Sequence, residues 1–293
     1  MLQLILNGLI TGSIIALGAI GLSMIYDILG LVNFAHGDFM TFGGYLTFFI
    51  SLTFLRPISF IPLTYDLLLS AILAIIGVGL FSILLDKIIW KKLRKKGAGT
   101  VTLLITAIGI ALALRNGIVF IWGSGTISLG IPISQAIEIF GLKITFFEII
   151  SILVAITLML LLDFLLKNTK IGKAMRALSD NQSLASITGI NVDKIISYTW
   201  FLGGAYAATG GILYGLITSF RPDMGWILLL PIFAAVILGS IGNVYGAMVG
   251  GLIIGLAQET SLVFIGSRYK IAVSFLLLII VLLVKPEGIF GGK

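Results

Sequence analysis

The sequence predicts an all-α integral membrane protein, a polytopic bundle of eight or nine transmembrane helices of which some are broken or re-entrant. Apolar residues make up 59% of the 293 residues and charged residues only 11%, whereas a soluble domain carries about 25% charged residues. The 19 basic and 12 acidic side chains are too few to cover a water-facing surface. The apolar runs are continuous and lack the alternating pattern of a membrane β-barrel, so helices are the expected spanning elements.

A helix needs about 20 mostly apolar residues to cross a bilayer. The apolar segments predict spans near 4–28, 39–55, 67–85, 100–122, 145–165, 195–217, 227–239, 243–263 and 270–284. The seventh and ninth segments are short. The seventh and eighth alternatively form one helix broken at Gly239 to Gly242, and the expected count is therefore eight or nine. No hydrophilic stretch exceeds about 30 residues, so a single transmembrane domain over residues 1–293 is expected.

Basic residues predict which end of the bundle faces the cytoplasm. Thirteen of the 19 Lys and Arg residues lie in segments 86–99 and 166–194 and in the C-terminal tail. Because Lys and Arg gather in cytoplasmic loops, both segments and the C-terminus are expected there. Three spans precede the first basic loop and place the N-terminus outside, unless a re-entrant segment near 29–44 reverses it. The other basic residues are assigned to a span (Arg115) or to the opposite side (Arg56, Lys143, Arg221, Arg268 and Lys270).

The composition also excludes several kinds of site. The chain has no cysteine, which excludes disulfides, Cys-ligated metals and thiol nucleophiles. A metal site needs three or four convergent ligands, and with a single histidine neither a metal site nor a catalytic residue is expected. The net charge of +7 is explained by membrane topology and gives no reason to expect nucleic acid as a partner. The N-terminus lacks a basic region, so no cleavable signal peptide is expected.

A polar cluster interrupts the apolar sequence between the first two spans. Asn33, His36 and Asp38 fall within six residues and are surrounded by glycines. Glycine permits a break in helical geometry, which membranes tolerate where the segment is buried in protein or lines a cavity. One interpretation is therefore a discontinuous helix beside a substrate pathway or gate. The alternative is a turn at the membrane interface whose polar residues cap two helices.

Isolated charges elsewhere in the spans have a structural interpretation. Asp27, Arg115, Glu148, Asp163 and Glu259 are scattered along the chain, and Asp27 and Arg115 are one candidate ion pair. A proton or ion relay would favour carboxylates near the middle of the membrane. The sequence offers few of them, so interfacial or paired structural charges are expected.

Small residues recur about four positions apart in two later spans. Gly203, Ala207, Gly211 and Gly215 form one ridge, and Gly242, Gly246 and Gly250 form another. Such ridges let helix backbones approach closely, which stabilises packing where lipid removes the usual hydrophobic drive. Helix packing is the expected role, and a hinge that moves during transport is the alternative.

Segment 169–194 has the pattern of two short amphipathic helices. Ile171, Met175, Leu178 and Ala185 recur at helical spacing. Ser183 is a candidate cap for the second helix, and Gly189 is a candidate C-cap. Neither helix is long enough to cross the bilayer. They are expected either to lie on the inner leaflet or to insert into a groove on a soluble partner.

Four blocks of sequence support a family resemblance. They are the segments 7–46, with VNFAHGDF, and 239–259, together with the tail KPEGIFG and the cytoplasmic motifs GKAMRALSD and TGINVDK. In these blocks the chain resembles the permease subunits of ATP-binding-cassette importers for branched-chain and other hydrophobic amino acids, most closely the smaller permease of the pair. It departs from the family pattern at Asp27 and at Arg115, and this leaves the substrate less certain than the family.

The resemblance implies a cell-membrane transporter subunit that is not itself an enzyme. Its implied partners are a second related permease, two cytoplasmic ATPase subunits that bind ATP and Mg, and an extracytoplasmic solute-binding protein. This chain would hold no cofactor. The resemblance assigns Asn33, His36 and Asp38 to the pathway or its gate. It assigns the following residues to the ATPase-coupling loop: Gly172, Ala174, Arg176, Ala177, Asp180 and Gly189.

Other transport functions remain open at this point. The same importer class includes carriers of urea, amides and other small solutes. An autonomous ion-coupled secondary transporter would need coupling carboxylates near the middle of the membrane. An intramembrane enzyme would need a nucleophile–base or metal constellation, for which a chain with one histidine and no cysteine offers little.

Overall fold

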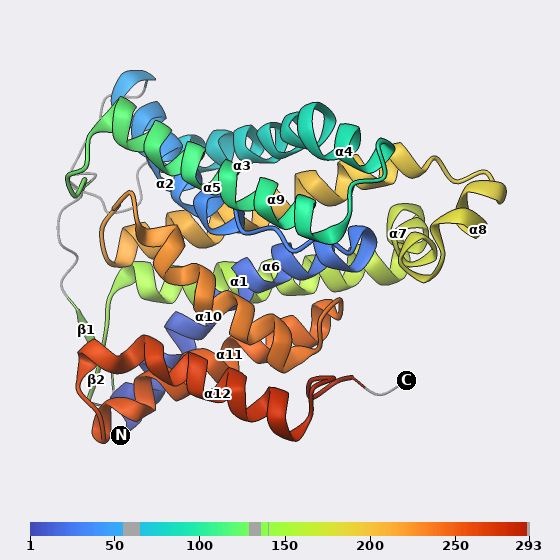
Figure 1. Ribbon diagram of the computed structural model, residues 1–293. Coiled ribbons are helices and arrows are strands. Elements are labelled where there is room, and N and C mark those ends of the chain that lie inside the picture. The colour runs from blue at the N-terminus through green and yellow to red at the C-terminus, as the bar shows by residue number, and fades with distance from the viewer. Residues whose placement is uncertain (55–64, 129–135, 140, 292–293) are drawn as a thin grey trace.

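Nine helices of at least 15 residues form the bundle in the computed structural model, which describes residues 1–54, 65–128, 136–139 and 141–291 (Figure 1). Seven of them are long and apolar enough to span a membrane. The nine helices are α1 (Leu2–Leu29), α2 (His36–Phe54), α3 (Tyr65–Leu85), α5 (Thr100–Trp122), α6 (Phe146–Asn168), α9 (Val192–Ile217), α10 (Met224–Gly239), α11 (Val244–Thr260) and α12 (Lys270–Val284). The prediction of an all-α membrane bundle is confirmed, with seven helices long and apolar enough to span and α10 as a shorter apolar helix. Arg56 and Lys293, used above for orientation, lie outside the described residues.

α1 is the central helix of the bundle. Its apolar window is 89% buried, and it packs against α6, α9, α10 and α11. A helix that is apolar on all sides is suited to such a position. By contrast, the apolar windows of α5 and α6 are only 22% buried and that of α12 only 6%. These outer helices therefore present their apolar residues to lipid or to another membrane subunit.

Glycines bring helix backbones into contact around this centre. A Cβ atom placed on Gly255 of α11 would lie 2.2 Å from the Gly12 Cα atom of α1, and one on Gly211 of α9 would lie 2.0 Å from the Met40 carbonyl oxygen of α2. A Cβ atom on Gly203 of α9 would lie 2.8 Å from the Ile25 Cδ1 atom and 3.1 Å from the Gly21 carbonyl oxygen of α1. These contacts agree with the expected packing role of the α9 ridge, and its alternative role as a hinge stays a prediction.

α10 and α11 form a hairpin, so the alternative of one helix broken at Gly239 to Gly242 is wrong. Gly239 lies against Gly246, and Gly250 lies against the Ala235 carbonyl, as in two antiparallel helices. Gly242 is not part of the α11 ridge. It lies in the turn with φ 84°, a left-handed conformation that favours glycine. Asn243 then caps α11 by accepting a hydrogen bond from the Gly246 N–H at 2.9 Å.

The basic segments gather at one end of the bundle, here called the cytoplasmic end. α7 (Lys170–Asp180), α8 (Gln182–Ile187), α4 (Lys91–Lys95) and the C-terminus lie there, and the N-terminus lies at the opposite end (Figure 1). The strands β1 (Ile137–Ile139) and β2 (Leu142–Ile144) form an antiparallel hairpin at that opposite end. α1 runs to the cytoplasmic end, and segment 29–44 then leads from there back into the bundle, so this arrangement agrees with an external N-terminus.

The predicted loop 86–99 is helical as far as Lys95. The π-helical turn η1 (Asp86–Trp90) continues α3 into α4. Buried Asp86 pairs with Arg94 at 2.7 Å, and Lys91 pairs with Asp193 of α9 at 2.8 Å. These ion pairs hold the basic segment against the bundle, and a run of basic residues alone does not reveal them. Two short 3-10 turns, η2 (Ser261–Val263) and η3 (Ser267–Tyr269), connect α11 to α12.

The close approach of α9 to α2 leads to a stability prediction. Gly211→Ala should lower the free energy of unfolding by about 1–3 kcal/mol, because the new methyl group would collide with backbone rather than with a movable side chain. Thermal unfolding of the purified protein in detergent measures this. Gly109→Ala in α5 is the matched control, since a Cβ there meets nothing within 4 Å. Equal melting temperatures for the two variants would contradict the packing role.

Candidate functional site

The break between α1 and α2 brings polar groups into the middle of the bundle. α1 ends at Leu29, and Gly30 follows in a left-handed conformation with φ 58°. The chain then runs back beside α1, because the His36 Nε2 atom lies 2.9 Å from the Gly18 carbonyl oxygen. Gly18 precedes the end of α1 by about 16 Å, at a rise of 1.5 Å per residue. α2 therefore begins at about mid-depth.

Asn33, His36 and Asp38 are all fully buried at this break. The interpretation as an interfacial turn is therefore wrong, and the segment is a discontinuous one inside the protein. The Asn33 Oδ1 atom accepts a hydrogen bond from the Ala35 N–H at 3.1 Å. Neither the Asn33 Nδ2 atom nor the His36 Nδ1 atom has a partner among the described residues. An unsatisfied buried polar group lowers the stability of the fold by about 1–3 kcal/mol. These two atoms would gain hydrogen bonds if the segment changed its contacts, so they are suited to a segment that moves.

Arg115 of α5 pairs with Asp38, and the predicted pairing of Arg115 with Asp27 is wrong. The Arg115 Nε and Nη2 atoms lie 3.2 and 3.3 Å from the two carboxylate oxygens of Asp38. Asp38 is in the first turn of α2, where the helix dipole also favours a negative charge. The guanidinium group lies 4.7 Å from the centre of the Trp226 ring. A buried carboxylate and its cation thus join α2, α5 and α10.

The start of α10 completes this polar cluster. The Thr41 hydroxyl accepts a hydrogen bond from the Gly225 N–H at 3.0 Å, and Gly225 and Gly37 touch through their backbones. Thr41, Gly225 and Trp226 were not predicted as site residues. The Asp38–Arg115 pair could have been anticipated from charge balance. Asp38 needs a cation inside the membrane, and Arg115 is the basic residue assigned to a span.

The segment after α6 forms two short helices, as predicted. Thr169 caps α7 by accepting a hydrogen bond from the Gly172 N–H at 3.0 Å. Asn181, rather than the expected Ser183, caps α8 through the Leu184 N–H at 2.9 Å. Gly189 ends the pair with φ 88°. Local side-chain geometry therefore defines both helices.

One face of this helix pair is held by the bundle and the other is free. Gly172, Met175, Leu178 and Ala185 are buried, and Gly172 lies against the backbone of α6. Ala174 and Ala177 are half-buried. The side chains of Leu184 and Ile187 on α8 are 60% and 81% exposed, and Arg176, Asp180 and Gly189 are also exposed. The fold thus presents apolar and charged groups together beyond the cytoplasmic end.

A family model described as the permease component of a branched-chain amino acid transport system matches residues 4–282. The chain belongs to this family. It is 35% identical to the high-affinity branched-chain amino acid transport system permease protein LivH of Salmonella typhimurium, over 99% of this chain and 95% of the relative. BraD of Pseudomonas aeruginosa is 34% identical over 99% and 95% of the two chains. The probable LivH of Methanocaldococcus jannaschii is 31% identical over 99% of this chain and 92% of the relative.

No solved structure matches the chain significantly. Family membership and the seven long apolar helices establish a multi-pass membrane protein that is the permease component of a transport system. The buried polar cluster and the α7–α8 pair are the two features of this permease whose geometry bears on transport.

The Asp38–Arg115 pair leads to a second stability prediction. Asp38→Asn should lower the free energy of unfolding by about 3–5 kcal/mol, because it leaves the Arg115 guanidinium without its anion inside the bundle. Chemical unfolding in detergent micelles measures the loss. Asp223→Asn is the matched control, since it removes the exposed ion pair with Arg221 and should cost less than about 1 kcal/mol. Similar losses in both variants would show that the Asp38 pair is not structurally important.

Proposed function

We propose that this chain forms part of the translocation pathway of an ATP-binding-cassette importer for branched-chain or other hydrophobic amino acids. The observation that carries the proposal is the α7–α8 pair, which is fixed to the bundle on one side and exposes Leu184 and Ile187 on the other. Exposed apolar side chains at the end of a short helix suit insertion into a groove on a soluble protein. The Salmonella and Pseudomonas relatives are named as branched-chain amino acid permeases, which supports the substrate class.

The partners in this proposal follow from the family of permease components to which the chain belongs. Two cytoplasmic ATPase subunits bind ATP and Mg and receive the α7–α8 pair, so this chain is neither an enzyme nor a cofactor-binding protein. A second related permease supplies the other half of the pathway, and an extracytoplasmic binding protein delivers the substrate. The proposed ATPase contacts are the exposed Arg176 and Asp180 of α7 and Gly189, which follows α8. Gly172, Ala174 and Ala177 hold α7 in place.

The proposed pathway lies beside the buried polar cluster. Asn33 and His36 each retain a buried atom that has no partner in the described chain, and α2 begins there at mid-depth. A change of contacts at this break would move α2 relative to α1 without unfolding either helix. The break thus combines the two requirements for a gate, which are polar groups inside the membrane and a backbone that is not a continuous helix.

Ion-coupled transport fits the structure less well than an ATP-driven cycle. Asp38 inside the bundle is paired with Arg115, and Asp27 lies near the cytoplasmic end of α1 rather than at mid-depth. Glu259 pairs with Lys270 and accepts a hydrogen bond from Thr11. A coupling site needs a carboxylate that exchanges its proton or ion during transport.

ATP-driven uptake tests the proposed function directly. The chain purified with its partner subunits and reconstituted into liposomes should accumulate radiolabelled L-leucine when ATP and the binding protein are supplied. Recovery of two ATPase subunits and a second permease in that preparation is expected. Uptake driven by an ion gradient through this chain alone would refute the proposal.

The exposed tip of α8 should couple ATP hydrolysis to transport. Ile187→Asp should reduce ATP-driven uptake at least tenfold, because a charged group would enter an apolar groove, while ATP hydrolysis by the ATPase subunits continues. Ile289→Asp is the matched control, since it places the same charge on another exposed isoleucine, whose N–H donates a hydrogen bond to the Leu238 carbonyl at the end of α10. Normal uptake with Ile187→Asp would remove α8 from the coupling contact.

A further inference from the structure

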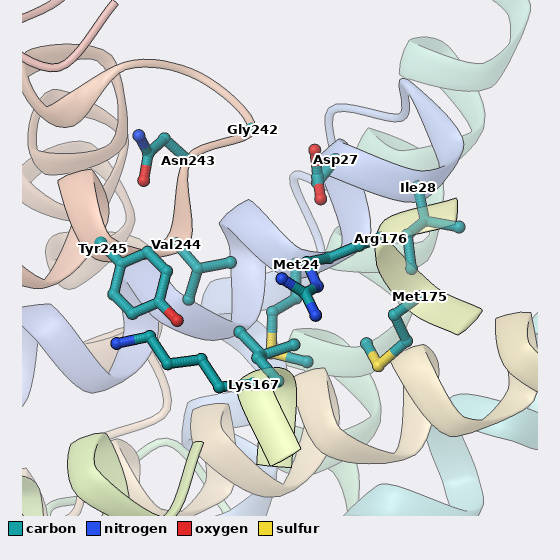
Figure 2. A pocket seen from close by; sticks show the side chains of 11 residues that line it. Met24, Asp27, Ile28, Lys167, Met175, Arg176, Gly242, Asn243, Val244 and Tyr245 are labelled. Atoms are coloured by element: carbon teal, nitrogen blue, oxygen red, sulfur yellow. The ribbon is translucent and has the colours of Figure 1, made fainter. Parts of the chain in front are cut away.

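A cavity of about 480 Å³ opens near the cytoplasmic end, between the last turns of α1 and α6, α7 and the turn that joins α10 to α11 (Figure 2). Its volume falls within the range of about 300–1,000 Å³ that small-molecule sites occupy. Asp27, which lines it, is about 13 Å along α1 from Gly18, at 1.5 Å per residue. The cavity is therefore distinct from the buried polar cluster.

Two opposite charges face this cavity and do not pair with each other. The Asp27 Oδ1 atom accepts a hydrogen bond from the Ser179 hydroxyl at 2.6 Å, and no described basic residue forms an ion pair with Asp27. Arg176 reaches into the cavity from α7 (Figure 2), and it makes no hydrogen bond or ion pair within the described ranges. An unpaired cation and an unpaired anion thus line one space.

The third charge on the lining is already neutralised. The Lys167 Nζ atom lies 2.6 Å from an Asp163 carboxylate oxygen and 5.4 Å from the centre of the Tyr245 ring. Among the described lining residues, Asp27 and Arg176 are therefore the two charged groups without an ion pair. Between these groups the wall is apolar, with Met24 and Val244 turned toward the cavity (Figure 2).

This lining is complementary to a small zwitterion that carries an aliphatic side chain. A guanidinium group binds a carboxylate with two parallel hydrogen bonds, and a carboxylate accepts hydrogen bonds from an ammonium group. We propose that the cavity binds a free aliphatic α-amino acid from the cytoplasm, with its carboxylate on Arg176, its ammonium group on Asp27 and its side chain against Met24 and Val244. Inorganic anions fit poorly, because Asp27 adds a negative charge to the same space.

A bound amino acid would connect three elements of the cytoplasmic end. Arg176 belongs to α7, Asp27 belongs to α1, and Val244 opens α11 directly after the hairpin turn. The ligand would restrain α7, which the proposed function makes part of the ATPase contact. The regulatory consequence is that amino acid accumulated in the cytoplasm slows its own import, and this part of the inference rests on the proposed function. The binding site itself depends only on the residues that line the cavity.

Equilibrium binding of radiolabelled L-leucine tests the site. The chain purified with its partner subunits in lipid nanodiscs, without the solute-binding protein, should bind leucine saturably at one site per chain. Asp27→Asn should weaken this binding at least tenfold while its retained oxygen still accepts the Ser179 hydrogen bond. Arg176→Gln should do the same in a complex that retains its ATPase subunits. Leucinamide, which lacks the carboxylate, and isocaproate, which lacks the ammonium group, should not compete.

Two further variants show whether leucine binds in this cavity. Lys173→Gln on α7 is the matched control, since Lys173 is exposed and does not line the cavity, and it should bind leucine as the native chain does. Leucine binding that is lost with Asp38→Asn but kept with Asp27→Asn would belong to the buried cluster and would overturn the proposal. Absence of saturable binding, or equal competition by inorganic phosphate, would also overturn it.

A transport measurement tests the regulatory consequence separately. Leucine preloaded on the cytoplasmic side should slow ATP-driven uptake by the native transporter and should have at least tenfold less effect on Asp27→Asn. Equal inhibition of both would overturn the regulatory role. Leucine binding at Asp27 in a complex that shows no ATP-driven uptake would refute the proposed function and leave the site itself intact.

Discussion

Close backbone contact around α1 is the interaction on which the rest of this structure depends. Lipid provides no hydrophobic drive for helices to associate, so dispersion between closely packed backbones has to supply it. Gly12 and Gly255 meet at one face of α1, and Gly21 and Gly203 meet at another. α9, α10 and α11 surround α1. The start of α2 and the helix α7 are in turn positioned by their contacts with α1.

The mid-depth start of α2 is a consequence of this packing. A non-helical segment inside the membrane is tolerated only where protein surrounds it, and α1 together with α9 and α10 provides that enclosure. Enclosure also explains the Asp38–Arg115 pair, since a charge carried into the bundle requires a counter-charge there. The break, the ion pair and the Gly37–Gly225 contact form one connected arrangement at the centre of the permease.

The cytoplasmic end is connected to this centre through α1. Ser179 of α7 donates a hydrogen bond to Asp27, and the Gln182 side chain of α8 donates one to the Ile28 carbonyl. Movement of the α7–α8 pair therefore acts directly on the last turn of α1, next to the break that precedes α2. A cavity remains between α7 and the α10–α11 turn beside these contacts. A ligand on its charged groups would therefore affect both α7 and the last turn of α1.

The sequence by itself determined the membrane location, the helical segments and the two short amphipathic helices after α6. These features follow from composition and from periodicity within a single segment, which act locally. Only the tertiary structure decided that Arg115 pairs with Asp38 rather than Asp27, that α10 and α11 form a hairpin, and that α2 begins at mid-depth. It also decided that Asp27 and Arg176 share a cavity. Each of these depends on contacts between segments far apart in the chain, and no local pattern in the sequence specifies which segments meet.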